Sequence, residues 1–400
     1  MDNFQLPEGW MIKTLDEVCE IARGGSPRPI KQFLTEAEDG VNWIKIGDAT
    51  ASTKYIYETK QKIKPEGIQR SRLVNEGDFL LSNSMSFGRP YIMKTSGCIH
   101  DGWLVLSDKS GEFEQDYLYH FLGSSAAYKQ FDNLAAGSTV RNLNIDLVKS
   151  VQLPLPPIPE QQRIVTLLDD AFARIVTATA HAEQNLKNAR ELFDSTLNTL
   201  FTEKGEGWVL KQLGDVYDVR DGTHDSPKYQ PDGYALITSK NLKKDGLNFE
   251  KIKFISESDY LKINERSAVH QGDILFAMIG TIGNPIVVEV EPNFAIKNVA
   301  LFKIKDGQNS YFLKYYLESP YVQEKMKKEA KGTTQKFVGL GYLRSFPITL
   351  PDIIEQQRIV NELNILATQT KHLEAIYQQK LDALAELKQS LLQQAFAGDL

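Results

Sequence analysis

The hexapeptide EQQRIV occurs at Glu160–Val165 and again at Glu355–Val360, a separation of 195 residues (355 − 160). Other stretches repeat at the same or nearly the same separation: Gly77-Asp-Phe-Leu with Gly272-Asp-Ile-Leu, Gly137-Ser-Thr with Gly332-Thr-Thr, and Gly9-Trp10 with Gly207-Trp208. Self-similarity at a fixed spacing indicates a duplicated unit, and each unit takes up about half of the 400 residues. We therefore expect two copies of one fold, one after the other in the chain.

Each EQQRIV is predicted to lie at the start of a long helix. Before the first one, LPLPPIP at 153–159 is expected to be a rigid extended segment that continues neither a sheet ladder nor a helix, with Pro159 in the first helical turn. Neither proline nor glycine follows before Phe201, which allows a helix of roughly 40 residues and roughly 60 Å. Gly205–Gly207 are expected to end this helix, and Gly398 the second one.

Apolar residues recur along both predicted helices at alternating spacings of four and three, which is typical of a coiled-coil seam. In the first helix they are Leu168, Phe172, Ile175, Thr179, Ala182, Leu186, Ala189, Phe193, Thr196 and Leu200. In the second they are Ile359, Leu363, Leu366, Thr370, Leu373, Tyr377, Leu384, Leu387 and Leu391, with Lys380 as a misfit. Two such seams in one chain favour an intramolecular pair over a homodimer or a core helix.

The remainder of each unit is predicted to be mixed α/β. Short β-branched and aromatic runs, such as Phe79-Leu-Leu-Ser and Ile274-Leu-Phe-Ala, alternate with Gly, Pro, Asn and Asp, as strands joined by turns do. Helices are expected over 113–134 and 311–330. The predicted fold is two similar mixed α/β domains joined by two long antiparallel helices, an intramolecular coiled coil with pseudo-two-fold symmetry. The predicted segments are domains at 1–155 and 206–350 and helical regions at 156–205 and 351–400.

The composition is that of an ordinary globular protein, 42% hydrophobic and 24% charged, with a net charge of −6. Residues 1–155 carry 17 Lys and Arg against 20 Asp and Glu, and residues 206–350 carry 20 against 18, so neither domain is strongly basic. Cys19 and Cys98 are not duplicated and are expected to be free thiols in a reducing compartment. Because the sequence shows neither a signal pattern nor an apolar run of about 20 residues, we expect a cytoplasmic protein outside the membrane.

Three motifs occur together in a fixed order. They are the proline lead-in with EQQRIV, VRDGTHDSPKY at 219–229, and LKQSLLQQAFAGDL at 387–400. With these motifs the chain, from Gly9-Trp10 to its last residue, resembles the specificity (S) subunit of bacterial and archaeal type I restriction–modification systems. The resemblance implies a non-catalytic subunit whose two target recognition domains each read one half of a bipartite site in double-stranded DNA.

The same resemblance implies partners and cofactors. The helices would set the unread spacer and dock two adenine methyltransferase (M) subunits, and restriction/translocase (R) subunits would join them. S-Adenosylmethionine, ATP and Mg are then expected on the partner subunits, with no cofactor on this chain. Since Arg23-Gly-Gly-Ser stands where the second domain has Asp221-Gly-Thr-His, the two half-sites are expected to differ.

The residues themselves argue against catalysis. Asn284-Pro-Ile-Val is the nearest string to the Asn/Asp-Pro-Pro-aromatic tetrapeptide of adenine methyltransferases, and it lacks the second proline and the aromatic residue. Gly280–Gly283 reads more simply as a hairpin turn than as a cofactor loop. The six histidines show no ligand spacing, so we predict no metal site and no catalytic residue, and a fused methyltransferase or nuclease is disfavoured.

DNA readout requires Arg, Lys, Asn, Gln, Ser or Thr on loops that reach a groove. Candidates in the first domain are Arg23, Ser26, Arg28, Asn83, Ser84, Arg89, Thr139, Arg141 and Asn142. Candidates in the second are Arg220, Thr223, His224, Lys228, Tyr229, Lys240, Asn241, Thr334, Gln335 and Lys336. The pattern shared by 137–142 and 332–336 favours phosphate contact or helix support over base discrimination. For His224, bracing of the loop and base contact are equally open, and the segment 23–28 can also be read as a simple tight turn.

Two further expectations follow from charge and from the alternative functions. A protein that binds DNA through phosphate neutralisation should be basic, so this chain alone should bind weakly, with the methyltransferase subunits completing a basic channel. The alternative is a scaffold whose helices join two protein-binding modules without contacting DNA.

Overall fold

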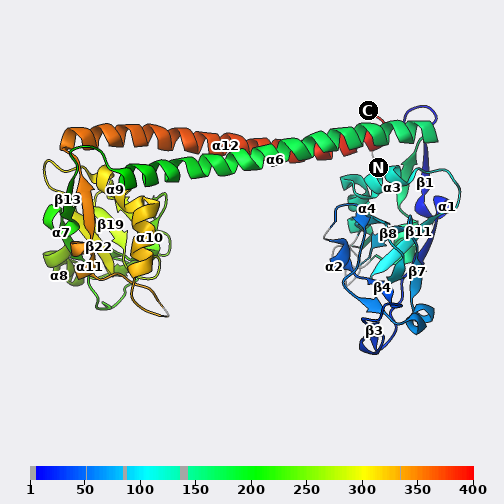
Figure 1. The fold of residues 1–400 in the computed structure, drawn as a ribbon, viewed down its shortest axis with the longest axis horizontal. Coiled ribbons are helices and arrows are strands. Elements are labelled where there is room, and N and C mark those ends of the chain that lie inside the picture. Colours follow the sequence, from blue (N-terminus) through cyan, green and yellow to red (C-terminus); the bar gives the residue numbers. More distant parts are fainter. Residues whose placement is uncertain (1–5, 51, 84–87, 136–142, 334) are drawn as a thin grey trace. The chain divides into compact units, whose positions relative to one another are not determined.

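The computed structural model describes residues 6–50, 52–83, 88–135, 143–333 and 335–400. The chain forms two compact units, unit 1 with residues 1–182 and 379–400, and unit 2 with residues 183–378. The boundaries fall inside two long helices, α6 (Ile158–Glu203) and α12 (Ile353–Ala397) (Figure 1). Each unit therefore contains one α/β module and part of both helices.

The described part of unit 1 contains two five-stranded sheets, in the orders β2-β11-β8-β9-β5 and β3-β6-β4-β10-β7, and a separate β1–β12 pair. Its strands are β1 (Met11–Thr14), β2 (Cys19–Arg23), β3 (Leu34–Thr35), β4 (Val41–Ile44), β5 (Tyr55–Ile56), β6 (Lys62–Ile63), β7 (Arg72–Val74), β8 (Phe79–Ser82), β9 (Pro90–Met93), β10 (Gly97–Ile99), β11 (Trp103–Asp108) and β12 (Gln152–Leu155). Its other helices are α1 (Leu15–Val18), α2 (Ile46–Ala49), α3 (Gln115–Leu122), α4 (Ser125–Ala135) and α5 (Ile145–Lys149), with 3₁₀ turns η1 (Ile30–Gln32) and η2 (Pro65–Arg70).

Unit 2 repeats this plan with sheets β14-β22-β19-β20 and β18-β15-β21 and the pairs β13–β23 and β16–β17. Its strands are β13 (Val209–Gln212), β14 (Asp218–Asp221), β15 (Tyr234–Ile237), β16 (Leu242–Lys243), β17 (Gly246–Leu247), β18 (Lys253–Ile255), β19 (Ile274–Ala277), β20 (Gly283–Val287), β21 (Phe294–Ile296), β22 (Val299–Lys303) and β23 (Pro347–Leu350). Its other helices are α7 (Leu213–Val216), α8 (Glu257–Ser267), α9 (Ser310–Glu318), α10 (Pro320–Glu329) and α11 (Leu340–Ser345), with the 3₁₀ turn η3 (Ser239–Asn241). The predicted helices at 113–134 and 311–330 are each two short helices, and Gly280–Gly283 lies in the β19–β20 hairpin, as expected.

Each long helix contributes to the cores of both units. The start of α6 (Ile164, Leu168) and the end of α12 (Leu392, Phe396) are buried in the core of unit 1. The end of α6 and the start of α12 are buried in the core of unit 2, through the residues Leu197, Phe201, Ile359 and Leu363. Residues 195 apart thus have the same role in the two units, which confirms the duplication at the level of packing.

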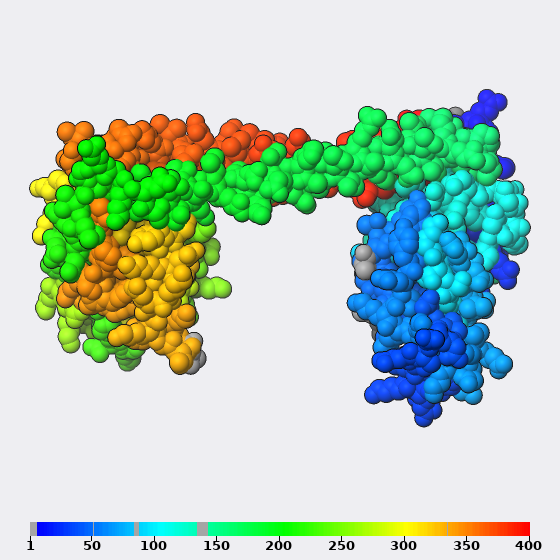
Figure 2. All heavy atoms as spheres, viewed as in Figure 1, coloured from blue at the N-terminus to red at the C-terminus, as the bar shows by residue number. Residues whose placement is uncertain are grey.

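The two helices run antiparallel where they meet. In unit 1, Arg163 donates to the main-chain oxygen of Leu400 at 2.6 Å, and the Lys388 ammonium lies 5.0 Å from the ring centre of Phe172. In unit 2, Arg190 forms an ion pair of 3.1 Å with Glu374. Figure 2 shows α6 in green beside α12 in orange and red. The predicted fold class, two mixed α/β domains with an intramolecular pair of long helices, is confirmed.

The EQQRIV motif holds the start of each long helix in place. Gln161 is buried, and its amide nitrogen donates to the carbonyl oxygens of Pro156 and Glu112, each at 2.8 Å. Gln356 repeats the bond with Pro351 at 2.9 Å. The motif's glutamate and arginine form a two-bond ion pair in both copies, Glu160 with Arg163 and Glu355 with Arg358. The predicted position of the motif at the start of each long helix is therefore confirmed.

The proline lead-in was predicted wrongly in one respect. Residues 152–155 form β12 and pair with β1, with Pro154 opposite Ile12. Proline is tolerated here because this sheet has two strands and both are edges, where the missing N–H need not face a partner. The end of α6 also differs from the prediction, since the left-handed residue directly after the helix is Lys204, with φ 54°, and not a glycine. Gly398, with φ 83°, follows α12 as expected.

The predicted seam holds along α6 but shifts within α12. Ile175, Ala182 and Leu186 are buried as predicted, whereas Leu387 on α12 is 47% exposed. Half-buried residues of α12 lie at 373, 377, 381 and 384. Two steps of four residues thus follow each other, where the predicted seam alternates between four and three. Such an extra step of four is a stutter, and it moves the seam past Lys380, which explains that misfit.

Candidate nucleic-acid interface

In unit 1 the segment after β2, residues 23–29, is called loop 1. It lies against the turn before β11, because the amides of Gly24 and Gly25 donate to the carbonyl oxygens of Trp103 (3.0 Å) and Ile99 (3.1 Å). A Cβ atom on Gly24 would lie 2.1 Å from the carbonyl oxygen of His100. Glycine is therefore required here for the close approach of the two backbones.

Asp101 binds several side chains of loop 1. Its carboxylate accepts a hydrogen bond of 2.6 Å from the Ser26 hydroxyl and lies 3.8 Å from the Arg28 guanidinium. Its main-chain oxygen accepts from Arg23 at 2.8 Å and from the Asn83 amide at 3.1 Å. The bond from Ser26 is the main cause that lowers the pKa of Asp101, so the loop is braced by a charged carboxylate.

In unit 2 the equivalent segment, residues 221–229, is called loop 2. The amides of Gly222 and Thr223 donate to the carbonyl oxygens of Val299 (3.1 Å) and Ile296 (3.0 Å). A Cβ atom on Gly222 would lie 2.1 Å from the carbonyl oxygen of Ile296. The two loops thus leave equivalent strands with similar backbone contacts.

The side chains that brace loop 2 differ from those of loop 1. Asp221 is buried and accepts from Arg266 and from His224, the latter at 2.9 Å. The other ring nitrogen of His224 lies 2.8 Å from the Asn298 side-chain oxygen. His224 therefore braces loop 2, which was one of its two expected roles, and a base contact by it stays a prediction.

The predicted DNA-binding residues fall into four groups. Exposed ones are Arg23, Arg28, Arg89, His224, Lys228, Tyr229, Lys240, Gln335 and Lys336, and partly exposed ones are Ser26, Arg220 and Thr223. Asn83 and Asn241 are buried, 2% and 8% exposed, so their amides support the backbone beside them. Ser84, Thr139, Arg141, Asn142 and Thr334 lie outside the described residues.

In unit 2, Gln335 and Lys336 lie on a segment that returns toward the β19–β20 hairpin. The amide of Gly280 donates to the carbonyl oxygen of Lys336 at 2.9 Å, and Phe337 pairs with Lys331 and Ile279. This segment and loop 2 are not joined by any hydrogen bond between described residues. The structure therefore places the predicted residues of unit 2 on separate polar segments.

Several residues that build the site were not among those predicted. They are Asp101, Asp221, Arg266, Asn298, Arg70 and Arg72. Asp101 and Asp221 each precede a glycine, which marks a turn. The contact of Asp221 with His224 spans only three residues, but Ser26 and Asp101 are 75 residues apart and Arg266 and Asp221 are 45 apart, so a local pattern could not show these two contacts.

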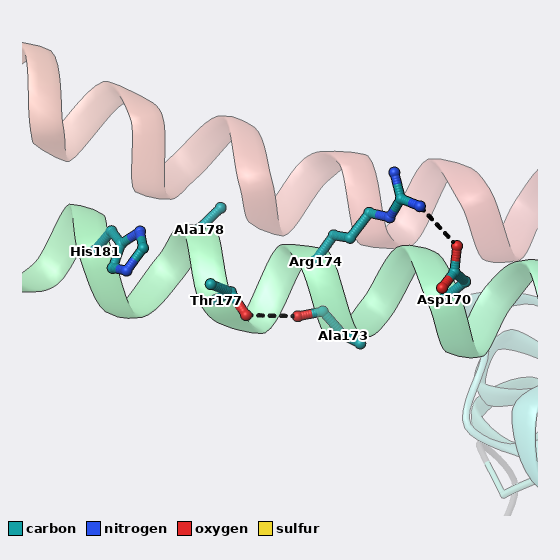
Figure 3. A pocket seen from close by; sticks show the side chains of 6 residues that line it. All are labelled: Asp170, Ala173, Arg174, Thr177, Ala178 and His181. Atoms are coloured by element: carbon teal, nitrogen blue, oxygen red, sulfur yellow. Dashed lines mark hydrogen bonds and ion pairs between the residues drawn. The ribbon is translucent and has the colours of Figure 1, made fainter.

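The described residues do not meet the requirements of a metal site or of a membrane-spanning helix, and a groove on their surface is open. No group of three or more His, Cys, Asp or Glu side chains there could hold a metal ion, and no described helix is long and apolar enough to span a membrane. A groove is lined by Asp170, Ala173, Arg174, Thr177, Ala178 and His181 (Figure 3). All six lie on one face of α6, so the groove is an open helix surface. Within it, Arg174 forms an ion pair of 3.0 Å with Asp170.

The chain contains two copies of one α/β module, joined by paired long helices, and each copy has a braced polar loop at the same place. These features define a class of two-module binding proteins that arise by duplication. The chain matches the family described as type I restriction modification DNA specificity domain over residues 7–188 and again over 205–382, and it belongs to this family.

Similar proteins include two specificity subunits that match nearly the whole chain. The MjaVIII type I restriction enzyme specificity subunit of Methanocaldococcus jannaschii is 23% identical, over 95% of this chain and 92% of its own. The EcoKI specificity subunit of Escherichia coli K12 is 24% identical, over 99% and 90%. The HsdS subunit of Thermoanaerobacter tengcongensis has the same fold, with a TM-score of 0.70, 21% identity and coverage of 100% and 99%. A chain from a structure of type I R-M complex assembly and conformational transition aligns with a TM-score of 0.79, 21% identity and coverage of 99% and 100%.

Proposed function

We propose that the chain is the non-catalytic DNA-recognition subunit of a type I restriction–modification complex, and that each module reads one half of a bipartite site. The observation that carries this proposal is the pair of equivalent loops. Loop 1 and loop 2 share their backbone contacts but present different side chains. Two modules that recognise different sequences are expected to have this combination, since the phosphate backbone repeats along DNA while the base edges vary.

The partners are proposed from the relatives and from the surface of α12. The relatives are specificity subunits of type I restriction enzymes, so the complex would contain two adenine methyltransferase subunits and restriction/translocase subunits. Ile354, Ile365 and Ile376 are 80%, 59% and 42% exposed. Their spacing of 11 residues is about three turns, so they lie on one side of the helix and offer an apolar docking surface. S-Adenosylmethionine, ATP and Mg would bind on the partners.

Substitution of Arg28 tests whether loop 1 contacts DNA bases. Its guanidinium is 83% exposed, and its contact with Asp101 at 3.8 Å is loose, so it is available to a groove. We expect methylome sequencing of cells with the complete system to show a bipartite adenine motif that disappears without this chain. Arg28→Ala should relax the first half-site by about 1–3 kcal/mol of discrimination and leave the second unchanged.

Lys31→Ala is the matched control, because Lys31 is an exposed cation just beyond loop 1. A methylome that does not depend on the chain would contradict the proposal and favour the scaffold function. Relaxation of both half-sites by Arg28→Ala would contradict the assignment of one half-site to each module.

A further inference from the structure

We propose that Arg70 and Arg72 join Arg23 in a phosphate-binding surface beside loop 1, which holds the DNA backbone next to the first half-site. The inference rests on the proposed function and adds residues from another part of the module to it.

The contacts of loop 1 bring these arginines together. Arg72 is the first residue of β7, and its Nε donates to the main-chain oxygen of Arg23 at 2.9 Å. Arg70 is the last residue of η2, and its carbonyl oxygen would lie 3.0 Å from a Cβ atom on Gly25. The end of η2 and the start of β7 therefore lie directly against loop 1.

The arginines of this surface form no direct ion pairs among the described residues, although the charge of Arg23 helps to lower the pKa of Asp101. Arg23, Arg70 and Arg72 are exposed, and none has an ion pair with a carboxylate of the described residues. The guanidinium of Arg70 lies 5.6 Å from the ring centre of Phe33, a contact that limits its motion. Exposed guanidinium groups held in place by main-chain and aromatic contacts are well suited to two-bond contacts with phosphate oxygens.

Two arginines beside loop 2 are bound to carboxylates. Arg220 forms an ion pair of 2.7 Å with Asp218, and Arg266 is bound to the buried carboxylate of Asp221. These arginines shape loop 2 and contribute little free positive charge. The arginine of unit 2 that resembles Arg72 is the exposed Arg344, which donates to the main-chain oxygen of Val219 at 2.8 and 3.0 Å.

The salt dependence of DNA binding tests this surface. The chain, assembled with its methyltransferase subunits, is titrated with duplex DNA carrying its mapped motif at several salt concentrations between about 50 and about 200 mM. Arg70→Gln and Arg72→Gln should each reduce the slope of log K against log salt by about 0.9. Affinity should fall equally for the cognate duplex and for one with a changed first half-site, because phosphate contacts carry no base information.

Two kinds of control accompany these variants. Arg70→Lys and Arg72→Lys retain the charge and should retain the slope. Lys109→Gln removes an exposed charge next to Asp108, at the far end of β11 from loop 1, and should leave the slope unchanged. Thermal melting of each variant separates a loss of binding from a loss of folding.

The outcomes separate this inference from the proposed function. An unchanged slope in both glutamine variants, with unchanged melting, overturns the phosphate surface even if Arg28→Ala relaxes the first half-site. A loss of affinity confined to the cognate sequence also overturns it, since the arginines would then read bases. A reduced slope supports the surface even where Arg28→Ala leaves the motif unchanged, in which case loop 1 loses its proposed role as base reader.

Discussion

His120 and Asp169 in unit 1 occupy the positions of Tyr315 and Asn364 in unit 2, each 195 residues earlier. The His120 Nε2 lies 2.8 Å from the Asp169 carboxylate, and the Tyr315 hydroxyl donates to the Asn364 amide oxygen at 2.5 Å. Both bonds join the first helix after the sheet to the long helix that follows it in the chain. One of the two equivalent contacts therefore contains an imidazole that can gain a proton as the pH falls, and the other does not.

The His120 contact makes the stability of unit 1 depend on pH. Burial lowers the pKa of His120, and the Asp169 carboxylate opposes this only in part. The unfolded chain then binds more protons than the folded one below the unfolded pKa of about 6.5. The contribution of His120 to the free energy of unfolding is therefore complete above that pH. It falls as the pH decreases, by at most about 1.4 kcal/mol per pH unit. We expect calorimetry between about pH 7.5 and about pH 5.5 to show a decrease of a few degrees in the melting temperature of the chain.

Exchange of the two pairs provides the matched control. The double variant His120→Tyr with Asp169→Asn copies the pair of unit 2 and should remove this part of the acid sensitivity. Burial lowers the pKa of His100 as well, so the difference between wild type and variant is the quantity to compare. Equal acid sensitivity in both proteins would assign the effect to other groups.

At the scale of elements, the sequence predicted the long helices better than the strands that precede them. The uninterrupted run up to Phe201 and the seam of α6 both follow from local spacing, and the structure confirms them. The sequence around Pro154 predicts no strand, because local sequence does not show that this segment lies at the edge of a sheet. The contact of Arg72 with Arg23 spans 49 residues, so it depends on how the two sheets of unit 1 meet and not on local spacing.

The exposed isoleucines of α12 predict where a partner subunit binds. Ile365→Lys and Ile376→Lys place charges on the proposed docking surface but outside the helix seam, since both residues are exposed. We expect each change to weaken co-purification of the methyltransferase subunit about ten-fold or more, with little change in melting temperature. The control is Leu261→Lys on α8, a residue that is 58% exposed and away from the long helices. Undiminished assembly of both isoleucine variants would show that this side of α12 is not the docking surface.

At the scale of the whole molecule, both long helices are continuous through residues that belong to different units. α6 begins in the core of unit 1, where Ile164 is buried, and ends in the core of unit 2, where Phe201 is buried. α12 connects the same two cores in the opposite chain direction, from Ile359 to Phe396. Because helix length is fixed at about 1.5 Å per residue, we propose that these helices set the number of unread base pairs between the half-sites.

Insertion of four helix-forming residues after Ala182 tests this proposal. Ala182 is the last residue of α6 in unit 1, and four residues lengthen a helix by about 6 Å. The insertion is close to one turn, so α12 can remain in contact across a stutter, as it already does near Lys380. With DNA rising about 3.4 Å per base pair, the methylated motif should gain one or two spacer base pairs and keep both half-sites. Four residues inserted instead into the exposed turn at 305–307 should leave the motif unchanged, because that turn lies outside both long helices. An unchanged spacer in the helix variant, with methylation retained, would mean that the distance between half-sites is set by the partner subunits and not by this chain.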